Sequence, residues 1–207
     1  AEEMLTVYND QMEPVGVAPR SQAHAQGLRH LVAHCWVISP REDGVWIWFQ
    51  KRAKDKADFP GYYDIAVGGH IAHREEPEEA ILREIREEIG LCLQKEDLID
   101  LGLWREDLWE KEETLDREAA RVFLYLCPHP VFAPGEEVEE MAAVPLEQWQ
   151  RKELEDSEWV EVLRQGQREQ QQERRREPRL HTHPAAWPDR PPPQPHKRGC
   201  SGSLYTS

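Results

Sequence analysis

Short apolar segments separated by polar turns dominate the first 130 residues of the chain. Segments rich in β-branched and aromatic residues, four to eight residues long, predict β-strands. The stretch SPREDG has the composition of a turn between two of these segments. The predicted strands are MLTVY (4–8), LVAHCWVI (31–38), VWIWFQ (45–50), LIDLGLW (98–104) and RVFLYLC (121–127).

A helical period replaces this pattern in two places. Pro77 suits a first helical turn and Gly90 a helix stop, so we expect a helix from about Pro77 to Ile89. Its buried stripe consists of residues within an arc of roughly 100°, namely Ile81, Leu82, Ile85 and Ile89. A second helix is expected from Pro145 to about Gln165. Strands and helices interleave without regular β-α-β spacing, which predicts an α+β fold with a mixed sheet covered by helices.

The end of the sequence changes in composition. Seven of the sixteen prolines fall between Pro178 and Pro195, and this part shows no apolar period. Such a composition cannot bury enough apolar surface to fold by itself. We therefore expect a globular domain over residues 1–166, and over residues 167–207 the end of the C-terminal helix followed by a disordered Pro-rich tail.

The charge balance excludes some classes of protein. The formal net charge is −14, from 40 acidic and 26 basic residues, which argues against a nonspecific nucleic-acid binder. No run of about 18 apolar residues exists, so we expect no membrane span. The start AEEMLTVYND lacks a basic segment followed by an apolar one, so we expect a cytoplasmic protein. The sequence does not decide whether the protein forms a homodimer.

Three glutamates lie beside the apolar stripe of the first helix. Glu84, Glu87 and Glu88 are neighbours on a helix surface, where like charges repel by a few tenths of a kcal/mol per pair, about 0.2–0.5. They form either a solvated acidic face or a site for a hard divalent cation such as Mg²⁺, which prefers carboxylate oxygens and often binds together with substrate phosphates.

The sequence around these glutamates resembles a known family signature. GHIAHREEPEEAILREIREEIGL, from Gly69 to Leu91, matches all nine fixed positions of the Nudix box, G-x5-E-x7-R-E-U-x-E-E-x-G-U with U apolar. The chain is therefore identified as resembling the Nudix superfamily. The resemblance implies an α/β/α sandwich around a mixed β-sheet, and metal-dependent hydrolysis of a diphosphate with Mg²⁺ or Mn²⁺.

The resemblance also implies roles for individual residues. Glu84, Glu87 and Glu88 match the metal-binding glutamates, and the carbonyl oxygen of Gly68 is a further expected ligand. Arg83 matches the arginine that holds the catalytic glutamate, a role that suits its rigid fork of donors. Glu84, Glu87 and Arg83 are thus the expected catalytic residues, and Glu75 matches a glutamate that is more often structural.

A narrower resemblance covers about residues 4 to 127. FQKRAKDKADFPGYYDIAVGGH is similar to the corresponding stretch of isopentenyl-diphosphate isomerases and the hydrolases related to them. In that branch Arg52 and Lys56 match residues that bind the substrate diphosphate. The implied partner is therefore a small-molecule diphosphate. On composition alone, QKRAKDK is more typical of a solvated basic loop, and the matching context gives the two interpretations equal weight.

The same branch suggests a second metal site. His24, His30 and His70 match the histidines of the isomerase approximately, the first two one residue short in spacing, and Asp116 and Glu118 fall near its paired acids. Three histidines and two carboxylates suit Mn²⁺ or Zn²⁺. The alternative is that these histidines only pack or cap.

Three functions remain open at this stage. The first is Mg²⁺-dependent hydrolysis of a nucleoside diphosphate linked to another moiety, or of a similar organic diphosphate. The second, isomerisation of isopentenyl diphosphate, is opposed by Gly68, which stands where the isomerases have a cysteine. The third is a sensor that binds a diphosphate without turnover. The general base is not assigned: besides the box glutamates, the candidates are Glu112, Glu113 and Glu118.

Overall fold

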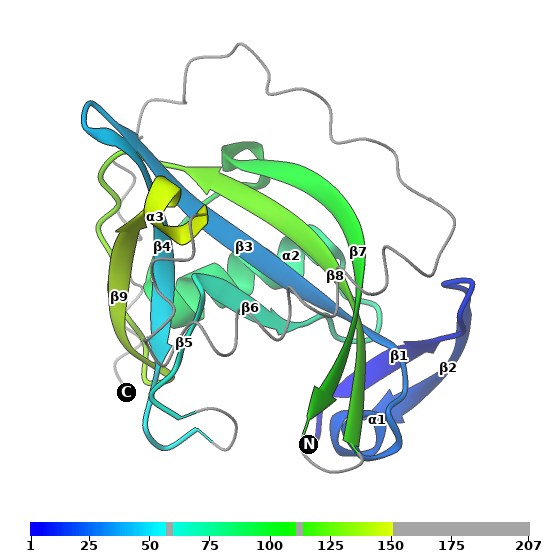
Figure 1. Ribbon diagram of the computed structural model, residues 1–207. Coiled ribbons are helices and arrows are strands. Elements are labelled where there is room, and N and C mark those ends of the chain that lie inside the picture. The colour runs from blue at the N-terminus through cyan, green and yellow to red at the C-terminus, as the bar shows by residue number, and fades with distance from the viewer. Residues whose placement is uncertain (57–59, 111–113, 151–207) are drawn as a thin grey trace, which may run out of the picture.

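One mixed β-sheet carries the fold (Figure 1). The computed structural model describes residues 1–56, 60–110 and 114–150. At its centre, β3 (His30–Arg41) runs parallel to β8 (Thr114–Leu126), and every other strand pair is antiparallel. On the far side of β8 lies β7 (Leu98–Glu110), which forms a long hairpin with it. On the other side of β3 lies β4 (Gly44–Arg52), followed by β9 (Val138–Pro145).

The two strands β3 and β4 separate along their length. They pair with each other through Val37–Arg41 and Gly44–Trp48, after which β3 pairs with β6 (Val67–His70) and β4 with β5 (Tyr63–Ile65). The short strands β5 and β6 therefore fill the space between the diverging strands. This places Gly68 and Gly69 on the sheet, beneath the helix that follows them.

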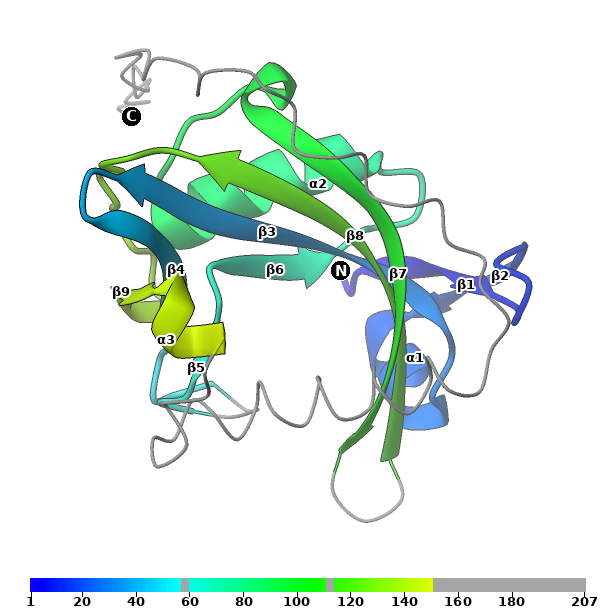
Figure 2. The same cartoon turned by 45° about the horizontal axis from the view of Figure 1, so that its top comes forward.

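Helices cover both faces of the sheet (Figure 2). One face packs against α2 (Pro77–Glu84) and its continuation η1 (Ile85–Ile89), and α3 (Leu146–Gln150) packs on the other. The first contact is made by an apolar stripe whose members are 0 % exposed, Ile81, Ile85 and Ile89. The expected sandwich around a mixed sheet is thus confirmed.

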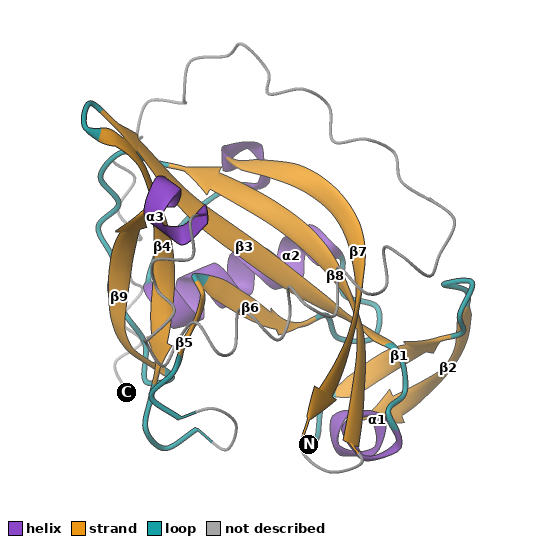
Figure 3. Ribbon diagram, viewed as in Figure 1, coloured by secondary structure: helices purple, strands orange, loops and turns teal. Residues whose placement is uncertain are grey.

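The remaining elements lie at the ends of the sheet (Figure 3). The hairpin of β1 (Met4–Tyr8) and β2 (Pro14–Pro19) forms a separate two-stranded sheet, against which α1 (Arg20–Gln26) packs. A short 3₁₀ turn, η2 (Lys95–Asp97), precedes β7. Among the described residues, no helix has the length and apolar character to cross a membrane.

The structure corrects several element boundaries. The predicted helix 77–89 is α-helical only to Glu84 and then widens into a π-helix. The polar stretch between the predicted strands 98–104 and 121–127 extends both strands to within four residues of each other. Four strands were not predicted, because β2 and β9 are rich in proline or acid and β5 and β6 are short. The predicted helix beyond Gln150 and the Pro-rich tail lie outside the described residues.

Candidate metal centre and active site

Close packing between β6 and α2 brings the glutamates over the sheet. The buried isoleucine stripe fixes the rotation of the helix, so the neighbouring arc with its carboxylates faces β6. A Cβ atom on Gly69 would lie 2.4 Å from the carboxyl carbon of Glu84. Only a glycine at position 69 leaves room for this carboxylate where it now lies.

The three glutamates differ in exposure. The side chain of Glu84 is 14 % exposed and that of Glu87 is 55 % exposed, whereas residue Glu88 is buried at 7 %. Glu84 ends the α-helix, and the other two lie in the π-helical turn η1. Turns of this kind are rare and are found frequently at functional sites. The arc therefore presents one accessible and two enclosed carboxylates.

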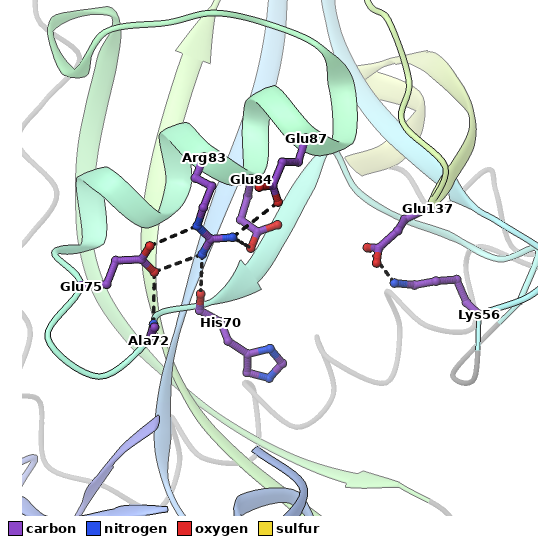
Figure 4. Close-up of polar contacts among 8 residues, drawn as sticks. All are labelled: Lys56, His70, Ala72, Glu75, Arg83, Glu84, Glu87 and Glu137. Carbon is purple, nitrogen blue, oxygen red and sulfur yellow. Dashed lines mark hydrogen bonds and ion pairs between the residues drawn. The ribbon is translucent and has the colours of Figure 1, made fainter. Parts of the chain in front are cut away.

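Arg83 connects the acidic residues (Figure 4). Its Nε and Nη2 donate to the two carboxylate oxygens of Glu75, each at 3.1 Å, and its Nη1 donates to Oε1 of Glu84 at 2.7 Å. Oε2 of Glu87 lies 3.5 Å from the same Nη1. The hydrogen bonds with Glu75, and then the charge of Glu84, raise the pKa of the guanidinium further above its usual value. Arg83 is thus anchored by Glu75 and restrains the carboxylate of Glu84.

Glu88 is held by neutral donors. Nε2 of Gln50 donates to Oε2 of Glu88 at 2.7 Å and to the carbonyl oxygen of Ala66 at 3.0 Å. The backbone N–H of Gly68 also donates to this carboxylate. Burial, with a smaller effect of the negative charge of Glu84, raises the pKa of Glu88 to about 8, although the Gln50 bond acts in the opposite direction.

The donor set fits a hard divalent cation. Burial also raises the pKa of Glu84, although Arg83 lowers it in part. A positive charge between two enclosed carboxyls with raised pKa values favours their ionised form. Oxygen ligands of this type are those that Mg²⁺ and Mn²⁺ prefer. The cluster therefore suits the expected metal through its chemistry.

The two predicted substrate-binding cations lie at the end of β4 and in the loop after it. Nη1 of Arg52 is 3.5 Å from Oδ2 of Asp64, and Nζ of Lys56 is 2.9 Å from Oε2 of Glu137. Glu137 in turn raises the pKa values of Glu84 and Glu88 through its charge. The pair of Lys56 and Glu137 therefore borders the acidic cluster.

Four of the five ligands predicted for the second metal site lie close together. The ring nitrogens of His24, His30 and His70 lie within 4.8 Å of one another, and Nε2 of His24 is 3.0 Å from Nε2 of His70. Oε1 of Glu118, which faces His30 across the parallel β3–β8 pair, is 3.4 Å from its Nε2. Asp116 lies on β8, but its side chain is outside the described part of the structure.

The electrostatics of this histidine cluster reflect its burial. Burial, followed by the positive charge of Arg20, lowers the pKa of His70 to about 3. Burial would raise the pKa of Glu118, but the hydrogen bond and charge of His30 lower it below the usual value. The lowered pKa keeps the imidazole of His70 neutral, which is the form in which a histidine ligates a metal ion. The cluster shares β6 with the glutamate site, since His70 directly follows Gly69.

Two residues near the site were not predicted. Gln50 is the last residue of the predicted strand VWIWFQ. An amide at the end of an apolar run was the only signal in the sequence, and its burial is seen in the structure alone. Glu137 lies in a segment with many glutamates, and its place beside Lys56 depends on the pairing of β4 with β9. Of the proposed bases outside the box, Glu112 and Glu113 lie outside the described residues, and Glu118 belongs to the histidine cluster.

Known proteins are similar to this chain in sequence. A sequence model of the NUDIX domain matches residues 28–177. An uncharacterized Nudix hydrolase of Clostridium acetobutylicum is 30% identical over 124 residues, covering 60% of this chain and 59% of that protein. An isopentenyl-diphosphate Delta-isomerase of Clavibacter michiganensis is 29% identical over 147 residues, covering 70% of this chain and 74% of the isomerase.

A solved structure has a similar fold. A crystal structure of a protein from Deinococcus radiodurans superimposes with a TM-score of 0.58 at 21% identity, covering 79% of this chain and 99% of that one. At this identity the match shows the fold. The chain spans about half to three fifths of the length of the first two curated relatives it matches, 59% and 48%. Because the family match extends over residues 28–177 of 207, the chain belongs to the Nudix family.

Proposed function

We propose that the protein hydrolyses the diphosphate linkage of a nucleoside diphosphate joined to another moiety, or of a similar organic diphosphate, with Mg²⁺ or Mn²⁺. One observation carries this proposal: Arg83 and Gln50 hold two enclosed carboxylates, Glu84 and Glu88, against the glycines of β6. A structural role does not require two such carboxylates to be enclosed side by side, since their charges oppose each other there.

Each residue has a role in the proposed reaction. Glu84, Glu88 and Glu87, together with the carbonyl oxygen of Gly68, would hold the cation, which supplies neutralisation of the charge that develops on the phosphate oxygens. Water attacks phosphorus, the bond between phosphorus and the bridging oxygen breaks, and a glutamate carboxylate accepts the proton of the water. Glu87 suits this last step because it is the most exposed of the three. Arg83 maintains the orientation of Glu84.

The diphosphate itself would be bound by the basic residues beside the cluster. Arg52 and Lys56 each carry a positive charge in this part of the structure, and both face carboxylates that a phosphate could replace. The organic part of the substrate would lie farther from the cation.

Isomerisation is the weaker alternative. It requires an acid and a base on opposite faces of the substrate. Gly68 has no side chain to serve as either, and Cys35, which faces Val67 across the β3–β6 pair, is 0 % exposed. Burial raises the pKa of the Cys35 thiol to about 12, which makes it a poor replacement acid or base at neutral pH. A sensor without turnover remains the third function to test.

The experiment is a substrate panel with matched variants. Purified protein with Mg²⁺ is incubated with nucleotide sugars, dinucleotides, nucleoside di- and triphosphates and isopentenyl diphosphate. Phosphate release with a coupled phosphatase, which cleaves the phosphate monoester products, and dimethylallyl product are measured separately. We expect hydrolysis that Glu84→Gln or Glu88→Gln abolishes, while Glu79→Gln, an exposed position of the same helix, retains it. Hydrolysis unaffected by both box variants, or dimethylallyl diphosphate as the sole product, would refute the proposal.

We also propose that the histidine cluster binds a second transition-metal ion. The close approach of three ring nitrogens and Glu118 supports this. Mn²⁺ titration followed by electron paramagnetic resonance would give two sites in the wild type and one in His24→Ala, with Glu84→Gln losing the other site instead. Equal stoichiometry in wild type and His24→Ala would contradict the second site. Zn²⁺ competition would then show which ion this cluster prefers.

A further inference from the structure

We propose that Glu137 is an internal competitor of the substrate: it occupies Lys56 in the resting protein and is displaced when a diphosphate group arrives. The inference rests on the proposed function, because it takes Lys56 as a residue that binds substrate phosphate. Glu137 lies outside the family signature and was not among the residues expected from the sequence.

The backbone places Glu137 at this point. The N–H of Ala53 donates to the carbonyl oxygen of Glu137 at 3.0 Å, where β4 and β9 pair. Two residues earlier, the N–H of Gly135 donates to the carbonyl oxygen of Glu88 at 2.9 Å. The segment thus connects the end of the metal-binding helix with the basic loop. Glu137 is held between the two by main-chain bonds that do not depend on its side chain.

Packing confirms how closely this segment approaches the helix. A Cβ atom on Gly135 would lie 2.2 Å from the carbonyl oxygen of Glu87. Only a residue without a side chain allows this approach of two backbones. The position of Glu137, two residues later, is therefore set by the helix that carries the acidic cluster.

The ion pair itself is accessible and therefore exchangeable. Nζ of Lys56 is 2.9 Å from Oε2 of Glu137, with the lysine side chain 26 % exposed and the glutamate side chain 62 % exposed. Figure 4 shows the pair beside the group formed by Arg83, Glu84 and Glu87. Ion pairs with this exposure stabilise proteins weakly. A ligand with more negative charge than a carboxylate can therefore replace Glu137 as the partner of Lys56 at a small cost in free energy.

The competition follows from charge. In the resting protein the ammonium group of Lys56 offsets the charge of Glu137, whose Oε2 is 2.9 Å from Nζ. A diphosphate brings its own negative charge to the same ammonium group. Binding of the substrate therefore includes breaking the ion pair. Removal of the glutamate charge should tighten binding only while Lys56 is present.

A double-mutant cycle tests this coupling. The probe is methylenediphosphonate, a diphosphate analogue without a hydrolysable bridge, bound to the full chain in the presence of Mg²⁺ and measured by calorimetry. The variants are Glu137→Gln, Lys56→Met and the double variant. Glu136→Gln, which makes the same change in charge at the neighbouring residue, is the control. Thermal unfolding verifies that each variant is folded.

The expected results follow from the weak ion pair. Glu137→Gln should bind the probe about two- to fivefold more tightly, and Lys56→Met should bind it more weakly. In the Lys56→Met background, Glu137→Gln should have no further effect, and Glu136→Gln should have none in either background. Tightening that persists without Lys56, or that Glu136→Gln reproduces, would show general charge repulsion and overturn the proposal. Absence of binding and of hydrolysis in the wild type would overturn the proposed function as well.

Discussion

Two adjacent glycines on β6 should respond very differently to the addition of a methyl group. A Cβ atom on Gly69 would lie 2.4 Å from Cδ, 2.5 Å from Oε1 and 2.7 Å from Cγ of Glu84. On Gly68 the nearest atoms would be Cδ2 of His34 at 3.3 Å and Cδ1 of Ile65 at 3.5 Å, close to ordinary contact. Neither glycine has a positive φ, so sterics alone decide the outcome.

The magnitude follows from these distances. Ordinary contact begins near 3.4 Å, so the carboxyl group of Glu84 must move by about 1 Å in Gly69→Ala, a misplacement that can cost about 10²-fold in rate. Such a shift also disrupts the 2.7 Å bond from Arg83. We expect Gly69→Ala to lose about 100-fold in kcat/KM and to bind Mn²⁺ more weakly. Gly68→Ala should stay within about threefold of wild type, well inside that loss.

The assay compares kcat/KM on the best substrate of the panel, Mn²⁺ affinity and the unfolding temperature of both variants. Because the displaced atoms belong to the end of one flexible side chain, the unfolding temperatures should stay close to that of the wild type. If Gly69→Ala retained full activity, the observed position of Glu84 would have no part in catalysis. If both variants lost activity equally, the contrast between the two glycines would be refuted.

Three further predictions concern the support of the site and its pH dependence. Gln50→Leu should weaken Mn²⁺ binding by about 10- to 100-fold because Glu88 loses its amide donor, whereas a titration equal to wild type would exclude this support. Since the folded pKa of Glu88 is about 8 against an ordinary 4.5, folding retains a proton between these values. Stability in EDTA should therefore fall as pH rises from about 5 to 8, by at most about 1.4 kcal/mol per pH unit. Urea unfolding across this range should lose that slope in Glu88→Gln. Ile85→Ala, at a position that is 0 % exposed, should cost about 2–5 kcal/mol of unfolding free energy. Val131→Ala, which is 84 % exposed, should cost less than about 0.5 kcal/mol in the same urea experiment.

The helix with its acidic arc could be predicted because two local signals agree. The isoleucine stripe determines which side of the helix packs on the sheet, and Pro77 and Gly90 mark its ends. The change from α to π geometry after Glu84 could not be predicted. Five residues are too few to distinguish a period of 3.6 residues from a wider turn. The strands that pack beneath the helix also come from other parts of the chain, so the local sequence does not describe their contacts.

The residues that complete the site depend on contacts distant in sequence. Gln50 reaches Glu88 only because β3 and β4 diverge and admit β5 and β6. Glu137 reaches Lys56 only through the register of β4 with β9. The sequence predicts neither the divergence of β3 from β4 nor the register of β9 on β4, since β9 has no alternating apolar pattern. The histidines were identified through a family resemblance. His70 comes beside His30 through the pairing of β3 with β6, and Glu118 comes opposite His30 through the parallel alignment of β3 with β8.

The backbone contacts around Gly135 join segments that are distant in sequence. The proposed hydrolysis should therefore appear only when folding is complete. The acidic arc and β6 lie close in sequence and can meet early, but Lys56 and Glu137 are 81 residues apart. Contacts of such separation form late, because closing a long loop costs entropy before it returns any contact energy. During refolding, secondary structure should therefore recover before the proposed hydrolysis, and the return of hydrolysis would report the moment when the segment around Gly135 joins the metal-binding helix.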